Sequence, residues 1–236
     1  ISGGVDSTLA VIICAEAVKM MGLPADYVTA VTMPCFGTTD RTKSNAIIVS
    51  EQLGATVRVI DIGESVMQHF KDIGHDPENR NVVYENAQAR ERTQILMDTA
   101  NKEGALLVGT GDLSELALGW CTYNADHMSM YGVNCSVPKT LVRYLVSFVA
   151  DERGGELGEV LREILATPVS PELLPAKENG EIAQQTESLV GPYELHDFYL
   201  YYVLRFGFGP AKIYRLARHA LGDRYPDDVL LHWLKN

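Results

Sequence analysis

Apolar residues along the chain fall into short and long runs that predict strands alternating with helices. Short runs rich in β-branched residues, at 27–32, 56–62 and 105–108, predict strands. Longer stretches with helical spacing, several of them ended by glycine, predict helices at 8–21, 42–53, 63–71 and 84–103. Because such an alternation forms a parallel sheet covered on both faces, the sequence predicts an α/β fold, a parallel sheet flanked by helices.

The pattern changes from Pro138 onward, where strand signals fade and helical spacing dominates. Helices are predicted at residues 139–151, 156–165, 195–205 and 211–221. The stretch 167–192 is rich in Pro, Gln and Glu and is interpreted as a loop or mobile flap. We therefore expect an α/β core over residues 1–150 and a helical extension of the same domain over residues 151–236.

Composition narrows the classes of function. The 20 basic and 31 acidic residues give a net charge of −11, which argues against nucleic acid as a partner. No apolar run approaches the roughly 20 residues that span a bilayer, so no membrane association is expected. The cysteines lack a C-x-x-C pair and zinc-ligand spacing, and are interpreted as reduced thiols of a cytoplasmic protein. They are Cys14, Cys35, Cys121 and Cys135.

The first seven residues, I-S-G-G-V-D-S, suit a turn that binds phosphate. Glycines let backbone amides approach phosphate oxygens, and the helix that follows adds its N-terminal amides and positive dipole end. The Ser2 and Ser7 hydroxyls can donate to the same oxygens. The Asp6 carboxylate suits this place only if Mg²⁺ lies between it and the phosphates. The alternative is an ordinary Gly-Gly turn in which Asp6 and Ser7 cap a helix.

A strand should precede this loop. Because Ile1 leaves no room for that strand, we expect it upstream, in a longer polypeptide.

The loop resembles the PP-loop signature of the ATP pyrophosphatases, a superfamily that includes GMP, asparagine, argininosuccinate and NAD synthetases and tRNA-modifying enzymes. Downstream motifs favour one member. The segment 86–92, N-A-Q-A-R-E-R, resembles the N-x-x-A-R-x-R helix of NAD synthetases, and 109–115 resembles their G-T-x-x-x-x-E turn. The motifs G-W-C-T-Y, D-H-M-S, S-V-P-K-T-L and P-V-S-P-E-L resemble the glutamine-dependent bacterial branch, as does the run Q-Q-T-E at 184–187. The resemblance extends from Ser2 to about Ala220.

This resemblance implies an adenine nucleotide alpha-hydrolase-like, Rossmann-like fold and a ligase that forms a carbon–nitrogen bond. The implied reaction amidates deamido-NAD⁺ to NAD⁺ through an adenylated intermediate, with ATP as substrate, Mg²⁺ as cofactor, and AMP and pyrophosphate as products. In the parent chain an upstream glutaminase domain would supply ammonia, and the family commonly forms homo-oligomers.

The resemblance also assigns site residues one by one. The expected ATP-binding residues are Ile1, Ser2, Gly3, Gly4, Val5, Asp6, Ser7, Thr110, Lys139 and Ser170. Those expected to bind deamido-NAD⁺ are Asn86, Arg90, Glu115, Trp120, Cys121, Thr122 and Tyr123. Asp6 and Glu115 are the expected metal ligands, with Glu115 also a candidate substrate contact.

Several roles have plainer alternatives. Thr110 suits a helix N-cap, Trp120 suits core packing, and Arg92 suits a solvated charge or structural ion pair. Tyr123 stands where the ammonia-only enzymes carry lysine, which puts that substrate contact in doubt. Histidine spacing indicates no metal site, and no side chain is expected to act as a catalytic nucleophile.

Two other functions stay open at this stage. One is another PP-loop amidating or modifying enzyme, such as a GMP synthetase or a tRNA-modifying ligase. The other is a non-catalytic nucleotide-binding domain of the same fold. None of the four cysteines lies in a setting that activates a thiol, so the chain is expected to use free ammonia and not glutamine.

Overall fold

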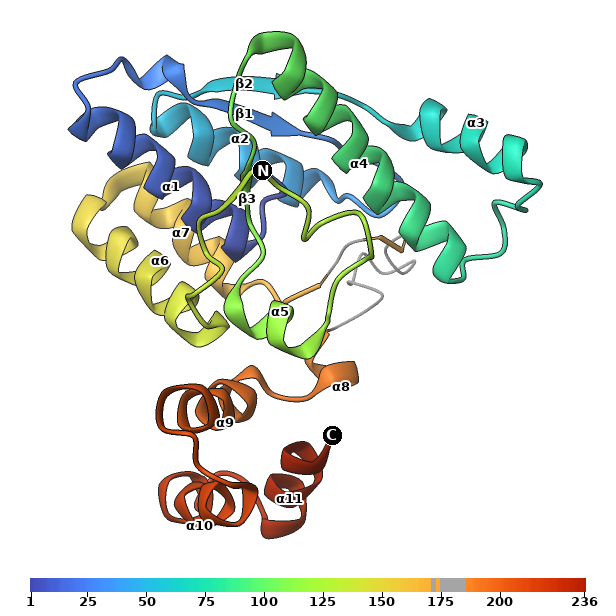
Figure 1. The fold of residues 1–236 in the computed structure, drawn as a ribbon. Coiled ribbons are helices and arrows are strands. Elements are labelled where there is room, and N and C mark those ends of the chain that lie inside the picture. Colours follow the sequence, from blue (N-terminus) through green and yellow to red (C-terminus); the bar gives the residue numbers. More distant parts are fainter. Residues whose placement is uncertain (171–172, 175–185) are drawn as a thin grey trace.

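A computed structural model describes residues 1–170, 173–174 and 186–236 of the 236-residue chain (Figure 1). Its elements, in chain order, are α1 (Val5–Met20), η1 (Ala25–Tyr27), β1 (Thr29–Thr32), α2 (Asp40–Gln52), β2 (Thr56–Val59), α3 (Gly63–Ile73), α4 (Val82–Glu103), β3 (Val108–Gly109), α5 (Leu113–Leu118), β4 (Tyr131–Gly132), α6 (Lys139–Arg153), α7 (Gly155–Ala166), α8 (Thr186–Val190), α9 (Tyr193–Phe206), α10 (Pro210–Leu221) and α11 (Asp227–Lys235). No helix in these residues is long and apolar enough to cross a membrane.

The strands pair in parallel, as the alternation of strands and helices predicts. β1 pairs with β2, with Thr29 opposite Thr56, and β3 pairs with β4, with Val108 opposite Tyr131. The described residues thus hold two parallel pairs. The amino group of Ile1 donates to the Val31 carbonyl at 2.5 Å, which places the segment before α1 beside β1.

Helices cover β1 on both faces, so successive residues of this strand enter different cores. Ala30 packs with α1, α2, α6 and α7 in one hydrophobic cluster, and Val31 packs with α3 and α4 in another. A parallel strand buried on both faces is typical of doubly covered sheets. In Figure 1, α3 and α4 lie on one side of the β1–β2 pair, and α1, α6 and α7 lie on the other.

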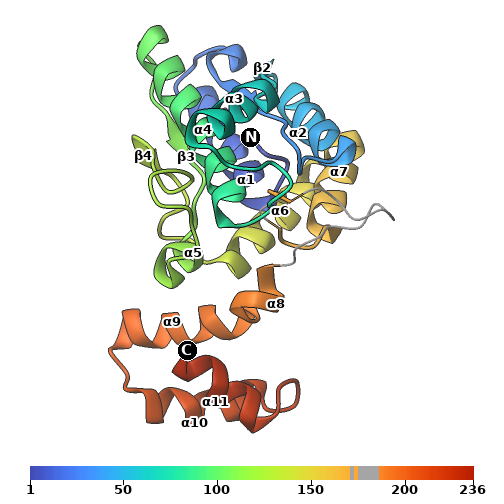
Figure 2. The same ribbon diagram turned by 90° about the vertical axis from the view of Figure 1, so that its right-hand side faces the viewer.

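The last three helices build a separate small core below the α/β part of the chain (Figure 2). Its buried residues are Leu195, Tyr199, Ile213, Ala217, Leu221 and Leu230. α9 is the element of this group that contacts α5 and α6. α7, in contrast, shares the hydrophobic cluster of α1 and α6. The division at residue 150 stays a prediction.

The predicted helices all form, with ends that differ by a few residues. Three predictions are wrong in extent. The strand predicted at 56–62 ends at Val59, because Ile62 already stands at the N-cap of α3. The strand predicted at 105–108 forms only at Val108 and continues to Gly109, whereas Leu106 is 62% exposed. Just before the strand, the Leu107 carbonyl accepts the amides of both Met130 and Tyr131. The predicted loop 167–192 contains α8, and β4 and α11 have no counterpart among the predicted elements. Glu172, Gln184 and Gln185 of the family motifs lie outside the described residues.

Candidate active site

The glycine-rich loop is closed by its two serine hydroxyls. The Gly4 amide donates to the Ser2 hydroxyl at 3.2 Å, and the Ser7 hydroxyl donates to the Gly4 carbonyl at 3.0 Å. The two hydroxyl oxygens lie 3.1 Å apart. The Ser2 amide donates to the Ser7 hydroxyl oxygen, also at 3.1 Å. This circuit fixes the loop in front of α1 but leaves the helix without a side-chain cap on its first amides. Those amides and the positive end of the helix suit a phosphate.

Gly3 has a backbone conformation and a close contact that a residue with a side chain could not adopt. Its φ is +91°, and a Cβ there would come within 2.4 Å of the Thr42 carbonyl oxygen on α2. The residue combines left-handed backbone with close approach to a neighbouring helix. Backbone conformation and packing against α2 therefore both require glycine at this position, whereas the approach of loop amides to phosphate stays a prediction.

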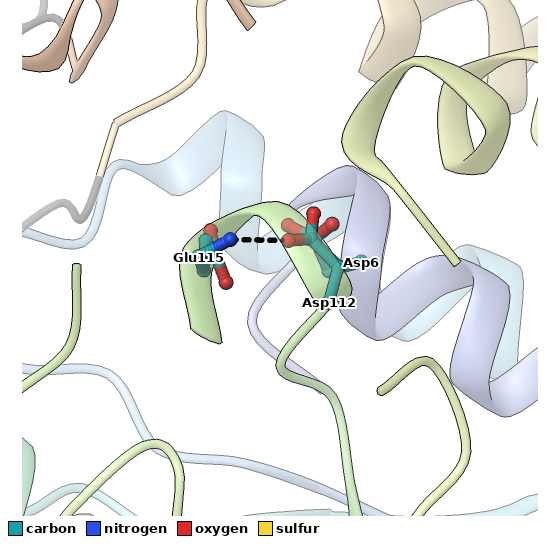
Figure 3. Close-up of side chains that lie close together, drawn as sticks. All are labelled: Asp6, Asp112 and Glu115. Carbon is teal, nitrogen blue, oxygen red and sulfur yellow. Dashed lines mark hydrogen bonds between the residues drawn. The ribbon is translucent and has the colours of Figure 1, made fainter. Parts of the chain in front are cut away.

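Four charged side chains meet at the N-terminal end of α1. The Lys139 ammonium lies 2.6 Å from an Asp6 oxygen, 2.7 Å from a Glu115 oxygen and 3.0 Å from an Asp112 oxygen. Lys139 and Asp112 are fully buried, and Glu115 and Asp6 are about one-fifth exposed. Figure 3 shows the three carboxylates side by side, with Asp112 also accepting the Glu115 amide as the N-cap of α5. We call these four residues the carboxylate–lysine cluster.

Burial controls protonation in the carboxylate–lysine cluster. Burial raises the pKa of Asp6 to about 6, and the Lys139 charge opposes that rise. The pKa of Glu115 rises to about 7 through burial and then repulsion from Asp6. Burial also disfavours the charged form of Lys139, but the three carboxylates outweigh it and raise its pKa above the ordinary value. Three acids around one ammonium leave an excess of negative charge for a further cation to neutralise.

The cluster fits a divalent cation with oxygen ligands. Asp6, Asp112 and Glu115 each offer a carboxylate oxygen, and these atoms all lie within 4.8 Å of one another. One Asp6 oxygen is buried without a hydrogen-bond partner. Carboxylate oxygens are the protein ligands that Mg²⁺ prefers, so the residues present suit the expected metal. The structure brings the two predicted metal ligands together and adds Asp112.

A second group of predicted site residues forms where α4 meets the 119–123 segment. The Thr122 hydroxyl donates to the Asn86 side chain at 2.8 Å, and Arg90 donates to the Tyr123 carbonyl at 3.1 Å. Asn86 and Arg90 lie one turn apart on the same helix face. Tyr123 is 74% exposed and Cys121 is exposed, whereas Trp120 is half-buried. Asn86, Arg90, Thr122 and Tyr123 thus meet, while the Glu115 side chain lies in the carboxylate–lysine cluster.

Arg92 is not a solvated charge. It donates to the Met33 carbonyl at 3.2 Å and the Gln88 carbonyl at 3.1 Å. It therefore ties α4 to the end of β1, a structural role carried by backbone hydrogen bonds.

Two predicted ATP contacts lie apart from this second group. Thr110 is half-buried at the end of β3, and its carbonyl accepts a hydrogen bond from Asn134 at 3.1 Å. Asn134 also donates to the Asp6 carbonyl at 3.0 Å, so it joins the glycine-rich loop to the end of β3. Ser170 is half-buried after α7. The assigned contacts of these residues and of Lys139 with ATP stay predictions.

Sequence reasoning missed two residues of the site. Asp112 is the N-cap of α5 and stands three residues before Glu115. Because Asp is a preferred N-cap residue, its place before this helix was a signal in the sequence that a second carboxylate lies near Glu115. Asn134 carries no such signal, because its two partners lie 24 and 128 residues away in the sequence.

The sequence of this chain is similar to those of known proteins. The family model for NAD synthase matches residues 1–207. A glutamine-dependent NAD(+) synthetase of Mycobacterium bovis is 46% identical over an alignment of 230 residues that covers 94% of this chain and 34% of that protein. An NH(3)-dependent NAD(+) synthetase of Hyperthermus butylicus is 31% identical over 89% of this chain and 68% of its own length.

A solved structure agrees at the level of the fold. A glutamine-dependent NAD(+) synthetase from Cytophaga hutchinsonii matches all of this chain and 43% of its own, with 19% identity and a TM-score of 0.73. The chain spans about a third of the length of the Mycobacterium relative. Since the family model covers most of the sequence, this chain belongs to the NAD synthase family.

Proposed function

We propose that this chain catalyses ATP-dependent amidation of deamido-NAD⁺ by ammonia, with NAD⁺, AMP and pyrophosphate as products. The nicotinate carboxylate attacks the α-phosphorus of ATP and expels pyrophosphate. Ammonia then attacks the carbonyl of the mixed anhydride and expels AMP. A carboxylate is a poor acyl donor, so adenylation provides the leaving group that ammonia displaces.

The observation that carries the proposal is the carboxylate–lysine cluster beside the uncapped start of α1, in a chain of the NAD synthase family. A pure anion site has no use for three carboxylates next to helix amides. A site that binds a metal–nucleotide complex needs both, because the metal joins the carboxylates to the phosphates. This combination favours a site for a metal–nucleotide complex, and membership of the NAD synthase family favours catalysis over nucleotide binding alone.

Each part of the site has a role that its geometry permits. The first amides of α1 would hold phosphate oxygens and stabilise negative charge as pyrophosphate leaves. Asn86 and Arg90, on one face of α4, would orient the dinucleotide over the 119–123 segment. No side chain forms a covalent bond in this scheme.

Asp6, Asp112 and Glu115 would hold Mg²⁺. The bound ion would supply charge neutralisation on the phosphates. Lys139 already carries one positive charge into the same cluster, and its contact with ATP, expected from the resemblance, is part of the proposal.

A cytoplasmic location and a homo-oligomeric state, both expected from the sequence and the family, belong to the same proposal.

The direct test is pyrophosphate release with Mg-ATP, ammonium and deamido-NAD⁺. The proposal expects turnover with deamido-NAD⁺ and formation of NAD⁺, and none with the GMP precursor or tRNA in its place. Release with either control substrate would favour another PP-loop enzyme. ATP binding without release of pyrophosphate under any of these conditions would favour a non-catalytic nucleotide-binding domain.

We expect the chain to form NAD⁺ with ammonium chloride but not with glutamine as nitrogen source. Glutamine hydrolysis needs a reactive thiolate. Burial raises the pKa of Cys14, Cys35 and Cys121 and leaves them less reactive. An upstream glutaminase domain of the parent chain would then supply ammonia. The measurement is NAD⁺ formation with each nitrogen source. A glutamine sample supplemented with a separate glutaminase is the control and should restore turnover, whereas turnover with glutamine alone would contradict the expectation.

Replacing Arg90 with alanine is expected to raise the KM for deamido-NAD⁺ more than the KM for ATP. The guanidinium lies exposed at the α4 face that meets the 119–123 segment, where it can pair with a substrate phosphate. Steady-state kinetics with each substrate varied in turn measures both constants. Lys102→Ala, which removes an exposed cation near the end of the same helix, is the matched control. Equal changes in both constants would reassign Arg90 to structure or to ATP.

A further inference from the structure

Two side chains of α9 reach from the C-terminal helices to the carboxylate–lysine cluster. Tyr193 and Asp197 lie one helical turn apart and share a face of α9. The Tyr193 ring lies 5.3 Å from the Lys139 ammonium, and Asp197 contacts the starts of α5 and α6. The residues that surround the cluster thus include a helix outside the α/β core.

Asp197 uses both oxygens to join two helices. One accepts a hydrogen bond from the Ser114 hydroxyl on α5, and the other accepts the Thr140 amide on α6 at 2.8 Å. The N-cap of α6 is Pro138, which provides no capping side chain. Asp197 therefore supplies that cap from a position 57 residues further along the sequence.

Ser114 extends this link to the cluster. Its hydroxyl oxygen accepts the Lys139 amide at 2.9 Å while its hydrogen bonds to Asp197. Ser114 is fully buried and Asp197 is 8% exposed, so water offers little competition for these bonds. The backbone that carries Lys139 is therefore held against α5, the helix that carries Glu115 and is capped by Asp112.

We propose that Asp197 is a positioning residue for the proposed metal and nucleotide site. It sets the separation between α5, with Asp112 and Glu115, and the start of α6, with Lys139. The inference rests on the proposed function, because it assigns the set geometry to Mg²⁺ and ATP. Asp197 touches neither substrate nor metal, and it acts through Ser114 and the α6 backbone.

A purely structural role is the alternative, in which Asp197 only docks α9 against the core. That role predicts a loss of stability with no change at the metal site. The positioning role predicts weaker metal binding, because outer partners that orient metal ligands typically contribute about 10- to 100-fold in affinity or activity. Metal affinity therefore separates the two.

The experiment compares Asp197→Ala and Asp197→Asn with wild type and with Glu194→Ala. Glu194 lies on the same helix but bonds to Arg224 and Tyr225 in the turn between α10 and α11, so it serves as the matched control. The readouts are Mn²⁺ affinity by electron paramagnetic resonance in the presence of α,β-methylene-ATP, kcat and KM for pyrophosphate release, and the melting midpoint.

We expect Asp197→Ala to weaken Mn²⁺ binding and to lower kcat by about 10- to 100-fold each, with a smaller change in the KM for deamido-NAD⁺. Asparagine can still accept the Thr140 amide but offers an N–H to Ser114, so its effect should be intermediate. Glu194→Ala should lower the melting midpoint without changing Mn²⁺ affinity. The effects of Asp197→Ala and Ser114→Ala should not add, because both remove the same link.

Unchanged Mn²⁺ affinity in Asp197→Ala would overturn the proposal and leave a structural role. If Asp197→Ala does not fold, Asp197→Asn and Ser114→Ala provide the test. Unchanged Mn²⁺ affinity in both of these variants would overturn the proposal. A wild-type protein that binds no Mn²⁺ with the nucleotide analogue also overturns it. Absence of turnover with deamido-NAD⁺ would refute only the proposed reaction, since the Mn²⁺ measurement does not depend on that substrate.

Discussion

Replacing Lys139 with methionine is expected to lower the free energy of unfolding by about 3–5 kcal/mol, because removing one partner leaves buried charge uncompensated. The ammonium pairs with Asp6, Asp112 and Glu115, and the lysine is fully buried. Methionine keeps the volume of the side chain and removes its charge. Urea unfolding at pH 8 without divalent cations measures the loss.

The loss should depend on pH and on Mg²⁺. The pKa values of Asp6 and Glu115, about 6 and about 7, already lie above their ordinary values, and removing the lysine raises them further. A carboxyl with a raised pKa in the folded state contributes stability below its unfolded pKa and loses it as pH rises through the folded pKa. The variant should therefore be closer to wild type at pH 5 than at pH 8.

Three further measurements test whether the lost stability comes from uncompensated carboxylate charge around Lys139. Mg²⁺ should restore part of the lost stability at pH 8, because it binds the folded carboxylates. Adding Asp112→Asn to Lys139→Met should also restore part of it, since one of the uncompensated charges is removed. Lys19→Met, at a 70% exposed lysine with a 3.8 Å ion pair, should change little. A loss for Lys139→Met no larger than that of Lys19→Met would contradict the predicted role of the buried ammonium.

Replacing Asp6 with asparagine is expected to slow pyrophosphate release by roughly 10²-fold or more, through loss of a metal ligand. Asp6 stands in the first turn of α1, beside amides that suit phosphate, and one of its oxygens is buried without a hydrogen-bond partner. Asparagine keeps the shape but removes the charge that a cation needs. The assay is initial-rate pyrophosphate release at saturating Mg-ATP.

The fold of the Asp6→Asn variant should be retained, because the change lowers the negative charge around Lys139. Near-ultraviolet circular dichroism checks this. Asp98→Asn, at an exposed position of α4, is the control for loss of a carboxylate elsewhere. Retention of more than about half of the wild-type rate would show that Asp6 is no metal ligand.

The sequence by itself determined most of the helices and the order of the strands between them, but not α8, α11 or β4. Helix ends follow from nearby residues, such as Asn81, which caps α4, and Gly104, which ends it with φ of +63°. The glycine-rich turn was also readable there, and these features depend on residues within a few positions of one another, which is the range that sequence patterns report. The bonds of the Ser2 and Ser7 hydroxyls within the loop were not predicted, because these hydroxyls were expected to face phosphate. The packing of Gly3 against Thr42 of α2 also depends on residues far apart in the sequence.

The sequence also allowed Asp6 and Glu115 to be predicted as ligands of one metal ion. Both residues stand at helix starts that follow the carboxyl ends of predicted strands. In a parallel sheet those ends share one edge, so the two carboxylates are expected to lie close together. The predicted strand at 105–108 was too long, since pairing at a strand edge depends on the neighbouring chain as well as on local β-propensity.

Only the tertiary structure decided how the charges are arranged. Lys139 reaches Asp6 across 133 residues of sequence, and Asp197 caps α6 from α9, 57 residues beyond Thr140. Burial of an ion pair depends on how whole helices pack, and hydrophobic periodicity does not encode which charged side chains meet inside. The sequence therefore determined the glycine-rich loop and its carboxylate, whereas helix packing decided that a buried lysine lies among three carboxylates and that Asp197 of α9 bonds to the starts of α5 and α6.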